Sequence, residues 1–412
     1  MLINYFKIAL AVLKRRKFFT LISLFGISFT LTILMVCTAF IDKMLSPSYP
    51  DLKRNRSLYI MNVATINSKE NWTRGSSASF YLLDHYMSKL KTPEKMAIFT
   101  FSRPANAYVN NKKIVIGYKY TDATYWEVAE YEFLEGKPYT QQQIDKQEYV
   151  GVISETTKKA YFGNVKTVVG KFIEADNVKY RVIGVVKDVP VTMLNFSGDL
   201  YLPYTLAKGN YKDPGLHGDF GAILLARSEA EVPAMKAEQQ QMIPKIPTND
   251  KDYDVLYVPA FTMLEAFSRL LFGNVRESGI EKMVITVSLF IFVFLLLPTI
   301  NLVNINITRI MERSSEIGVR KAFGASSKTL VYQFIIENVI LTLFGGLLAI
   351  VFSVLALYLF NQSNLVPSLN LVLNIRVLAF GLLTCLFFGM LSGVYPAWRM
   401  SRLTVVDALK TH

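Results

Sequence analysis

The amino-acid sequence predicts a membrane protein with four transmembrane α-helices and a large α+β extracytoplasmic domain inserted between the first and second helices. Three observations support this fold class. The 412-residue chain is 51% hydrophobic, its apolar residues gather in four long runs, and most of its net positive charge lies in three short segments outside those runs. A hydrocarbon core of ~30 Å needs about 20 apolar residues per helix, and each run meets that length.

The four runs place the predicted spans at 18–41, 283–303, 329–360 and 377–396. The first run follows Lys14-Arg15-Arg16-Lys17, a start that also suits a secretory signal. Its 24 uncharged residues exceed the about 7–15 apolar residues of a signal peptide, so we expect a retained anchor. The third run is longer than a bilayer requires, which predicts a tilted or projecting helix.

Charge predicts the orientation of the spans. The segments 1–17, 304–328 and 399–412 together carry 13 basic and 3 acidic residues, a net charge of +10, which leaves +3 for the rest of the chain. Cytoplasmic loops carry an excess of Lys and Arg, so these segments and both termini are predicted inside, and the loop 361–376 outside. A nucleic-acid partner is not predicted, since that requires basic residues clustered on a soluble domain.

The segment 42–282 predicts an α+β extracytoplasmic domain of two lobes, the first of which contains residues near both ends of the segment. It has no cysteine; Cys37 and Cys385 lie in the first and fourth spans and are expected to pack as small apolar residues. Helices are predicted at 79–90, 154–162 (N-capped by Ser154), 229–242 and 261–272, the last with an apolar side. Strands are predicted at 58–66, 95–101, 114–120, 149–153, 179–186, 200–203, 222–226 and 254–258.

No catalytic, metal or cofactor site is predicted. The histidines are His85, His217 and His412, without the spacing of metal ligands. Gly163 and Gly170-Lys171 leave six residues between the glycines, whereas a phosphate loop needs four and then Ser or Thr after the lysine. We therefore expect a turn there, no ATP-binding site and no enzymatic activity in this chain.

The cytoplasmic segment 304–328 predicts a short ionic helix. Glu312, Arg313, Glu316 and Arg320 recur at spacings of three or four residues, which brings acids and bases to one helical face. Gly324 is a plausible C-terminal stop. A charged helix between two spans favours a soluble partner on that side of the membrane.

Small residues recur on the faces of the predicted spans. Such spacing lets helices approach closely in lipid, either within one chain or at a dimer interface, and the sequence leaves both open. Glu337 is the only charged residue within the four spans, where helix packing or a partner contact is favoured over a transport site. The candidate packing residues are Ser23, Gly26 and Thr30 in the first span, Gly345, Ala349 and Ser353 in the third, and Gly389 and Gly393 in the fourth.

Three sets of motifs occur in order along the chain. VISE at 152–155, YFG at 161–163, VGK at 169–171 and VIGVVKD at 182–188 lie in the extracytoplasmic domain. EIGVRKAFGAS at 316–326 lies in the cytoplasmic segment, and SGVYPAWR at 392–399, followed by SRL at 401–403 and VDAL at 406–409, closes the last span. Together they resemble the MacB/FtsX-like family of ABC transporter permeases, including its periplasmic core domain.

The resemblance implies a permease subunit of the bacterial inner membrane, paired with a second copy or a paralogue and with a separate cytoplasmic ABC ATPase that binds ATP and Mg²⁺. It also implies mechanotransmission and amphiphilic cargoes such as antimicrobial peptides, macrolide-like drugs or lipoproteins. A periplasmic adaptor or outer-membrane channel is implied as a further partner. The alternative is a regulator that transmits ATPase state to a periplasmic cell-wall hydrolase or sensor. By resemblance, the residues that couple to the ATPase are Glu312, Arg313, Glu316, Arg320 and Lys321.

Overall fold

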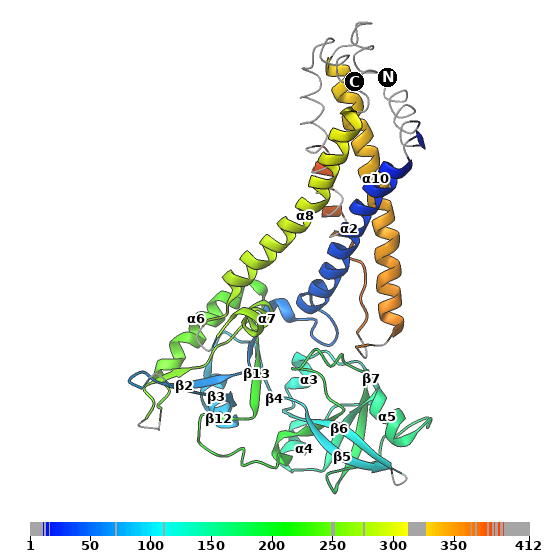
Figure 1. Cartoon of the computed structure of the whole chain (residues 1–412). Coiled ribbons are helices and arrows are strands. Elements are labelled where there is room, and N and C mark those ends of the chain that lie inside the picture. The colour runs from blue at the N-terminus through cyan, green and yellow to red at the C-terminus, as the bar shows by residue number, and fades with distance from the viewer. Residues whose placement is uncertain are drawn as a thin grey trace. The chain divides into compact units, whose positions relative to one another are not determined.

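The computed structural model forms two compact units. It describes residues 17–70, 72–109, 112–248, 252–274, 277–311, 327–363, 365–366 and 369–376, with 11, 14–15, 379–380, 383, 386–387 and 390. One unit contains residues up to Met44 and the helices after Met283, and the other comprises Leu45–Met283 with Val366–Leu369. The long helices and the sheet are drawn in Figure 1.

Three long helices occupy the first three predicted spans. They are α2 (Lys17–Leu45), α8 (Ile280–Met311) and α10 (Ser327–Ser363). In the described part of the chain, two helices are long and apolar enough to cross a membrane, Thr20–Leu45 and Ile335–Ser363. Helix α8 contains the run 283–303 and continues eight residues beyond it, into the predicted cytoplasmic segment. Most of the predicted fourth span, 377–396, lies outside the described residues.

The extracytoplasmic unit is built on one mixed sheet, so the predicted α+β class holds for it. Its central strand order is β14-β2-β3-β13-β4-β6-β11-β8-β10-β7, with β1 paired to β13, β12 to β3, β5 to β6 and β9 to β10. The pairs β11–β6 and β10–β8 are parallel, and the other pairs are antiparallel. The strands are β1 (Ser57–Ile60), β2 (Val63–Asn67), β3 (Trp72–Ala78), β4 (Lys95–Thr100), β5 (Arg103–Val109), β6 (Lys112–Thr121), β7 (Phe133–Gly136), β8 (Val150–Ser154), β9 (Phe172–Ala175), β10 (Val178–Val186), β11 (Leu200–Pro203), β12 (His217–Gly218), β13 (Phe220–Leu225) and β14 (Val255–Tyr257).

Short helices cover the sheet. Ser154 caps α5, since its hydroxyl accepts a hydrogen bond from the Thr157 N–H, and Gly163 ends that helix with a φ of 69°, as the sequence predicts. The α-helices are α3 (Tyr125–Val128), α4 (Gln141–Asp145), α5 (Glu155–Phe162), α6 (Val232–Met242) and α7 (Met263–Phe272). The tighter or wider turns are η1 (Arg54–Arg56), η2 (Leu82–Tyr86), η3 (Met87–Lys89), η4 (Tyr204–Leu206), η5 (Glu229–Glu231) and η6 (Ile243–Lys245).

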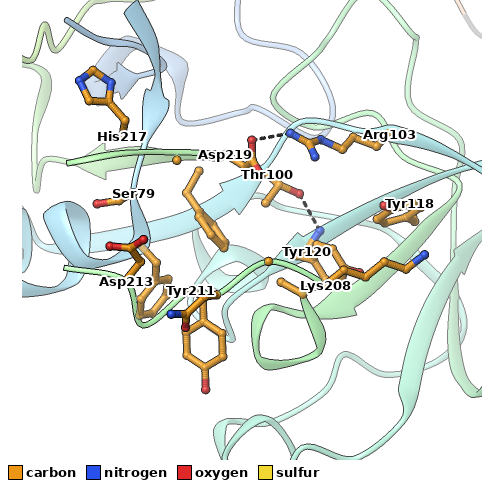
Figure 2. A pocket seen from close by; sticks show the side chains of 16 residues that line it. Ser79, Thr100, Arg103, Tyr118, Tyr120, Lys208, Tyr211, Asp213, His217 and Asp219 are labelled. Atoms are coloured by element: carbon orange, nitrogen blue, oxygen red, sulfur yellow. Dashed lines mark hydrogen bonds and ion pairs between the residues drawn. The ribbon is translucent and has the colours of Figure 1, made fainter. Parts of the chain in front are cut away.

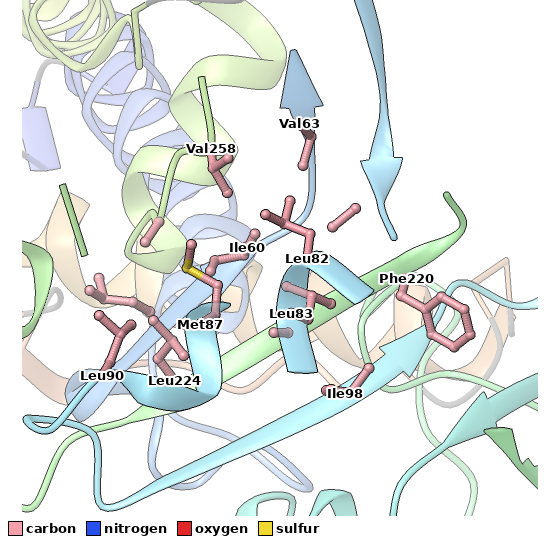
Figure 3. Close-up of a cluster of buried hydrophobic side chains, with 14 of the residues drawn as sticks. Ile60, Val63, Leu82, Leu83, Met87, Leu90, Ile98, Phe220, Leu224 and Val258 are labelled. Atoms are coloured by element: carbon pink, nitrogen blue, oxygen red, sulfur yellow. The ribbon is translucent and has the colours of Figure 1, made fainter. Parts of the chain in front are cut away.

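The hydrophobic core of this unit is divided into three clusters. The first, shown in Figure 3, joins residues from both ends of the insertion, such as Leu58 and Leu83 with Val258. The other two are formed mainly by residues 97–202. Tyr204 packs against all three clusters. Figure 1 shows the corresponding groups, β2, β3, β12 and β13 with α6 and α7, and β5 to β7 with α3 to α5.

Two predicted elements differ in the structure. The predicted strand 58–66 is two strands, because the chain changes partners after Ile60: β1 pairs with β13, whereas β2 pairs with β3 and β14. The predicted helix 79–90 contains a π turn, η2, followed by the 3₁₀ turn η3. Leu82 and Met87 are five residues apart and both buried, and a π turn places that spacing on one face.

Candidate functional site

The structure describes only part of the predicted site. The five predicted coupling residues, Glu312, Arg313, Glu316, Arg320 and Lys321, lie outside the described residues, as do Gly389 and Gly393. The small residues of the first and third spans, on α2 and α10, are described. Three further features occur in the extracytoplasmic unit: a buried ionic network, a backbone bridge and a pocket.

Helix α2 buries one narrow face. Ser23 is 1% exposed and begins a row of buried side chains at every fourth residue: Ile27, Leu31, Met35 and Ala39. Gly26 and Thr30 lie beside this row and are half-buried. The Thr30 hydroxyl donates to the Gly26 carbonyl at 2.9 Å, so it is satisfied within its own helix. Cys37 is exposed, and the packing role expected for it is not seen against the described residues.

Helix α10 presents the complementary row to α2 of the same chain. A Cβ on Gly345 would lie 2.6 Å from Ile27 Cγ2, so only glycine allows this approach. The Thr32 hydroxyl lies 3.4 Å from the Ala349 carbonyl oxygen. Small residues on a TM helix permit such close packing. Gly345 and Ala349 therefore pack against α2 of the same chain.

The two helices run in parallel. Residue numbers rise together along the two helices at their contacts: Ile27 contacts Gly345, Thr32 contacts Ala349, Met35 contacts Ser353 and Phe40 contacts Phe360. Near the start of α10, Glu337 and Asn338 are buried at 1% and 3% exposure. Polar residues at this depth are unusual in a TM helix and mark a specific helix contact or a functional group.

A buried ionic network follows directly after α2. The Asp51 and Arg54 side chains are each 4% exposed, and Arg54 Nε donates to Asp51 Oδ2 at 2.7 Å. Arg54 Nη1 donates to the Ser46 carbonyl at 2.7 Å, one residue beyond the end of α2. The Tyr59 hydroxyl donates to the same carboxylate, at 2.7 Å from Oδ2. Burial raises the pKa of Asp51, against the opposing effect of Arg54 and the two hydrogen bonds.

A backbone bridge joins the two connections of the inserted unit. The Tyr59 N–H donates to the Phe261 carbonyl at 2.7 Å, and the Phe261 N–H donates back to the Tyr59 carbonyl at 3.0 Å. Tyr59 lies on the segment that leaves α2, and Phe261 on the segment that returns to α8 through α7. The sequence shows a pattern that fits the ionic network, an Asp and an Arg three residues apart with a Tyr five residues later. No local pattern identifies Phe261 as the backbone partner of Tyr59.

A pocket of about 160 Å³ lies beside the central strands, between the first cluster and β6 (Figure 2). Three of its charged residues form ion pairs, Arg103 with Asp219 across the pocket and Lys208 with Asp176. Asp213, also in the lining, accepts a hydrogen bond from the Gly215 N–H at 2.8 Å. Both ring nitrogens of His217, which also lines the pocket, form hydrogen bonds. Nε2 lies 3.0 Å from the Thr65 hydroxyl and Nδ1 lies 2.7 Å from the Ser76 hydroxyl. Burial lowers the His217 pKa. The lining therefore combines tyrosine phenols with charged and hydrogen-bonded side chains.

Within the described residues, no group of three His, Cys, Asp or Glu side chains could hold a metal ion. A buried lysine occurs instead. Lys119 has no exposed surface, donates to the Leu194 carbonyl at 3.1 Å and lies over the Phe99 ring at 5.2 Å. Burial lowers its pKa well below the usual range. With one carbonyl acceptor and no access to solvent, it is a core residue.

Comparisons with known proteins identify both parts of the chain. The model of the MacB-like periplasmic core domain matches residues 20–242, and that of the FtsX-like permease C-terminal domain matches residues 288–405. The Macrolide export ATP-binding/permease protein MacB of Burkholderia cenocepacia is 26% identical over 69% of this chain and 40% of its own. MacB of Escherichia coli K12 is 27% identical over 73% of this chain and 44% of its own.

The chain thus spans about two fifths of the length of the curated relatives it matches. Among solved structures, a domain of a putative permease protein from Porphyromonas gingivalis covers 52% of this chain and 92% of its own, at 14% identity and a TM-score of 0.42. The periplasmic region of MacB from Actinobacillus actinomycetemcomitans covers 50% and 89%, at 18% identity and a TM-score of 0.35. Because the core-domain model covers more than half of the sequence, this chain belongs to the MacB/FtsX-like family of ABC transporter permeases.

Proposed function

We propose that this chain is the permease subunit of a mechanotransmission ABC complex. A separate cytoplasmic ATPase, which holds ATP and Mg²⁺, drives movement of the spans, and the extracytoplasmic unit changes conformation in response. The permease works as a homodimer or a paralogous heterodimer in the bacterial inner membrane. Its cargo is an amphiphile such as an antimicrobial peptide, a macrolide-like drug or a lipoprotein. Two matches, to the periplasmic core domain and to the permease C-terminal domain, support the permease part of this proposal.

The observation that carries this proposal is the bridge between Tyr59 and Phe261. Tyr59 is fully buried, and its hydroxyl binds the Asp51 carboxylate, which is also paired with Arg54. The segment leaving α2 is thereby hydrogen-bonded to the segment that returns toward α8. In the proposed mechanism, movement of either of these segments reaches β1 through Tyr59.

The proposed topology has four spans with both termini inside. The parallel contacts of α2 and α10 support it, since two parallel spans require one crossing in the opposite direction between them, which α8 supplies. The proposed segments are 1–17 inside, 18–41, 42–282 outside, 283–303, 304–328 inside, 329–360, 361–376 outside, 377–396 and 397–412 inside. The test uses Cys37→Ala/Cys385→Ala chains carrying Ser68→Cys or Ser326→Cys and a membrane-impermeant thiol reagent. Labelling of position 326 from outside intact cells overturns the topology.

The proposed contact with the ATPase lies on the helix around Glu312, Arg313, Glu316, Arg320 and Lys321. An acid contributes little to positive-inside orientation, so Glu316 is not explained by membrane insertion. Charge reversal at a buried interfacial ion pair costs on the order of 2–5 kcal/mol. Glu316→Lys should therefore lose co-purifying ATPase, whereas the matched control Glu281→Lys, in the first turn of α8, should retain it. Equal ATPase recovery and turnover in both variants refutes the coupling role.

The same preparation distinguishes export from regulation. Crosslinking in intact cells, followed by purification of the full chain, captures the extracytoplasmic partner. An adaptor or outer-membrane channel is the expected result for an exporter. A cell-wall hydrolase or a sensor kinase would replace the export role with a regulatory one.

A further inference from the structure

Helix α7 packs with its polar side inward. Ser268 has no exposed surface, and its hydroxyl donates to the Glu265 carbonyl at 2.9 Å. Glu265 is paired with Lys236 of α6, and the Arg269 guanidinium lies 5.4 Å from the centre of the Phe261 ring. An ordinary surface helix of a soluble domain turns its charged residues to water and its apolar residues to the core. Toward its C-terminal end helix α7 does the reverse, whereas Met263 at its start packs against the second hydrophobic cluster.

The side of α7 that faces away from the unit is apolar. Leu270 is 78% exposed and Leu271 is 58% exposed. They continue the apolar side that begins at Met263 and Leu264, which are themselves half-buried. A capping box between Thr262 and Glu265 fixes the start of the helix, so this face is held in place rather than frayed. Adjacent exposed leucines on an ordered helix mark a surface that meets something apolar.

Helix α7 is fastened to the beginning of α8. The Ser268 hydroxyl donates to the Ser278 carbonyl at 2.9 Å, two residues before α8 starts. The Gly279 φ of 71° closes the turn, and a Cβ there would lie 2.5 Å from the Gly273 nitrogen, so no side chain fits. The Met283 N–H then donates to the Gly279 carbonyl at 3.0 Å, which forms the first turn of α8.

This connection fixes the depth of α7. Met283 is the first residue of the apolar run 283–303, in which Val284 and Ile285 are exposed. The end of α7 and the start of α8, through Met283, belong to the same compact unit. Leu270 and Leu271 are therefore held at the level where the chain enters the bilayer. A protein partner is not needed to cover leucines at that level, because the acyl chains are there.

We propose that α7 is an interfacial helix that rests on the outer leaflet of the membrane and inserts Leu270 and Leu271 at the boundary between head groups and acyl chains. Amphipathic helices bind membranes in this way through their apolar face. Because α7 is fixed both to Phe261 and to the start of α8, the lipid surface supports the base of the extracytoplasmic unit. The partner is the phospholipid bilayer itself.

The test is site-directed spin labelling of the full chain in phospholipid nanodiscs made of phosphatidylcholine and phosphatidylglycerol. Cys37→Ala/Cys385→Ala chains carry a single cysteine at Leu270, Leu271 or Leu194. Leu194 is a matched control, since it is 62% exposed and lies in the same unit. Power-saturation measurements compare collision with oxygen, which partitions into lipid, and with a water-soluble nickel chelate. We expect the ratio to shift toward oxygen at positions 270 and 271, and toward nickel at position 194.

Two results would overturn the proposal. Nickel accessibility at 270 and 271 equal to that at 194 would place the leucines in water. Low accessibility to both reagents, with dipolar broadening between labels, would place them against a second copy of the chain. Leu271→Trp in Trp398→Phe chains, in nanodiscs with bromine-labelled acyl chains, gives an independent readout. A loss of emission on bromination no larger than in Trp398→Phe chains with Leu271 intact contradicts insertion.

Discussion

Asp51→Ala should be among the most damaging single substitutions outside the hydrophobic clusters. It removes the carboxylate that receives Arg54 Nε and the Tyr59 hydroxyl, both at 2.7 Å. The guanidinium and the phenol would remain buried with those hydrogen bonds lost. Removal of one member of a buried ion pair lowers the free energy of unfolding by about 3–5 kcal/mol. A buried hydroxyl left without a hydrogen-bond partner lowers it by about 1–3 kcal/mol when counted alone. Since the two losses share one acceptor and are not additive, we expect a decrease of about 4 kcal/mol in the free energy of unfolding.

The control for this substitution is another Asp–Arg pair in the same unit. Asp219 is paired with Arg103, but their side chains are 53% and 57% exposed, so Asp219→Ala should cost about 0–1 kcal/mol. Unfolding of the full chain in detergent by urea, followed through the emission of the buried Trp126, measures both. A double-mutant cycle with Arg54→Met should show that the two losses at the buried pair are far from additive. A cost below about 1 kcal/mol for Asp51→Ala, or additive losses, refutes the reasoning.

The remaining predictions concern the helix pair and the buried lysine. Gly345→Val should destabilise the contact of α2 with α10 by about 1–3 kcal/mol in SDS-driven unfolding, because a Cβ there lies 2.6 Å from Ile27. Ile27→Ala in the same chain should recover part of that loss, and no recovery would contradict the contact. Burial lowers the Lys119 pKa, so the folded state releases this proton at lower pH than the unfolded state, and the free energy of unfolding should rise with pH between the folded pKa and about 10.4. Lys119→Met should flatten that rise, and an unchanged slope would exclude Lys119 as its source.

Burial explains which elements could be predicted from the sequence. The strands β4, β8, β11 and β13 are short apolar runs, and they form where predicted because their side chains are buried on both faces of the sheet. Strand β3, with the sequence WTRGSSA, is mostly exposed and carries no such pattern, so it was not predicted. Strand β5 contains Pro104, which usually argues against a strand, but it pairs on one side only, with β6.

The candidate site was less predictable because it depends on contacts between distant residues. The rows of small residues on α2 and α10 were visible as spacing, yet the sequence could not choose between a dimer interface and an intrachain pair. The 2.6 Å approach to Ile27 assigns Gly345 to the intrachain pair. Similarly, Asp51 and Arg54 are neighbours in sequence, but Tyr59 and Phe261 are 202 residues apart and no local pattern connects them. Helix α7 was predicted to have an apolar side, but not that its polar side would face the protein.

Tyr59 connects the two segments that join the extracytoplasmic unit to its flanking helices. Its backbone holds Phe261, its hydroxyl holds Asp51, and its side chain is buried in the second hydrophobic cluster. A displacement of the segment after α2 therefore cannot reach β1 without also displacing the segment that enters α7 and α8. Under the proposed function, α2 and α8 would therefore act on the sheet as one input rather than two.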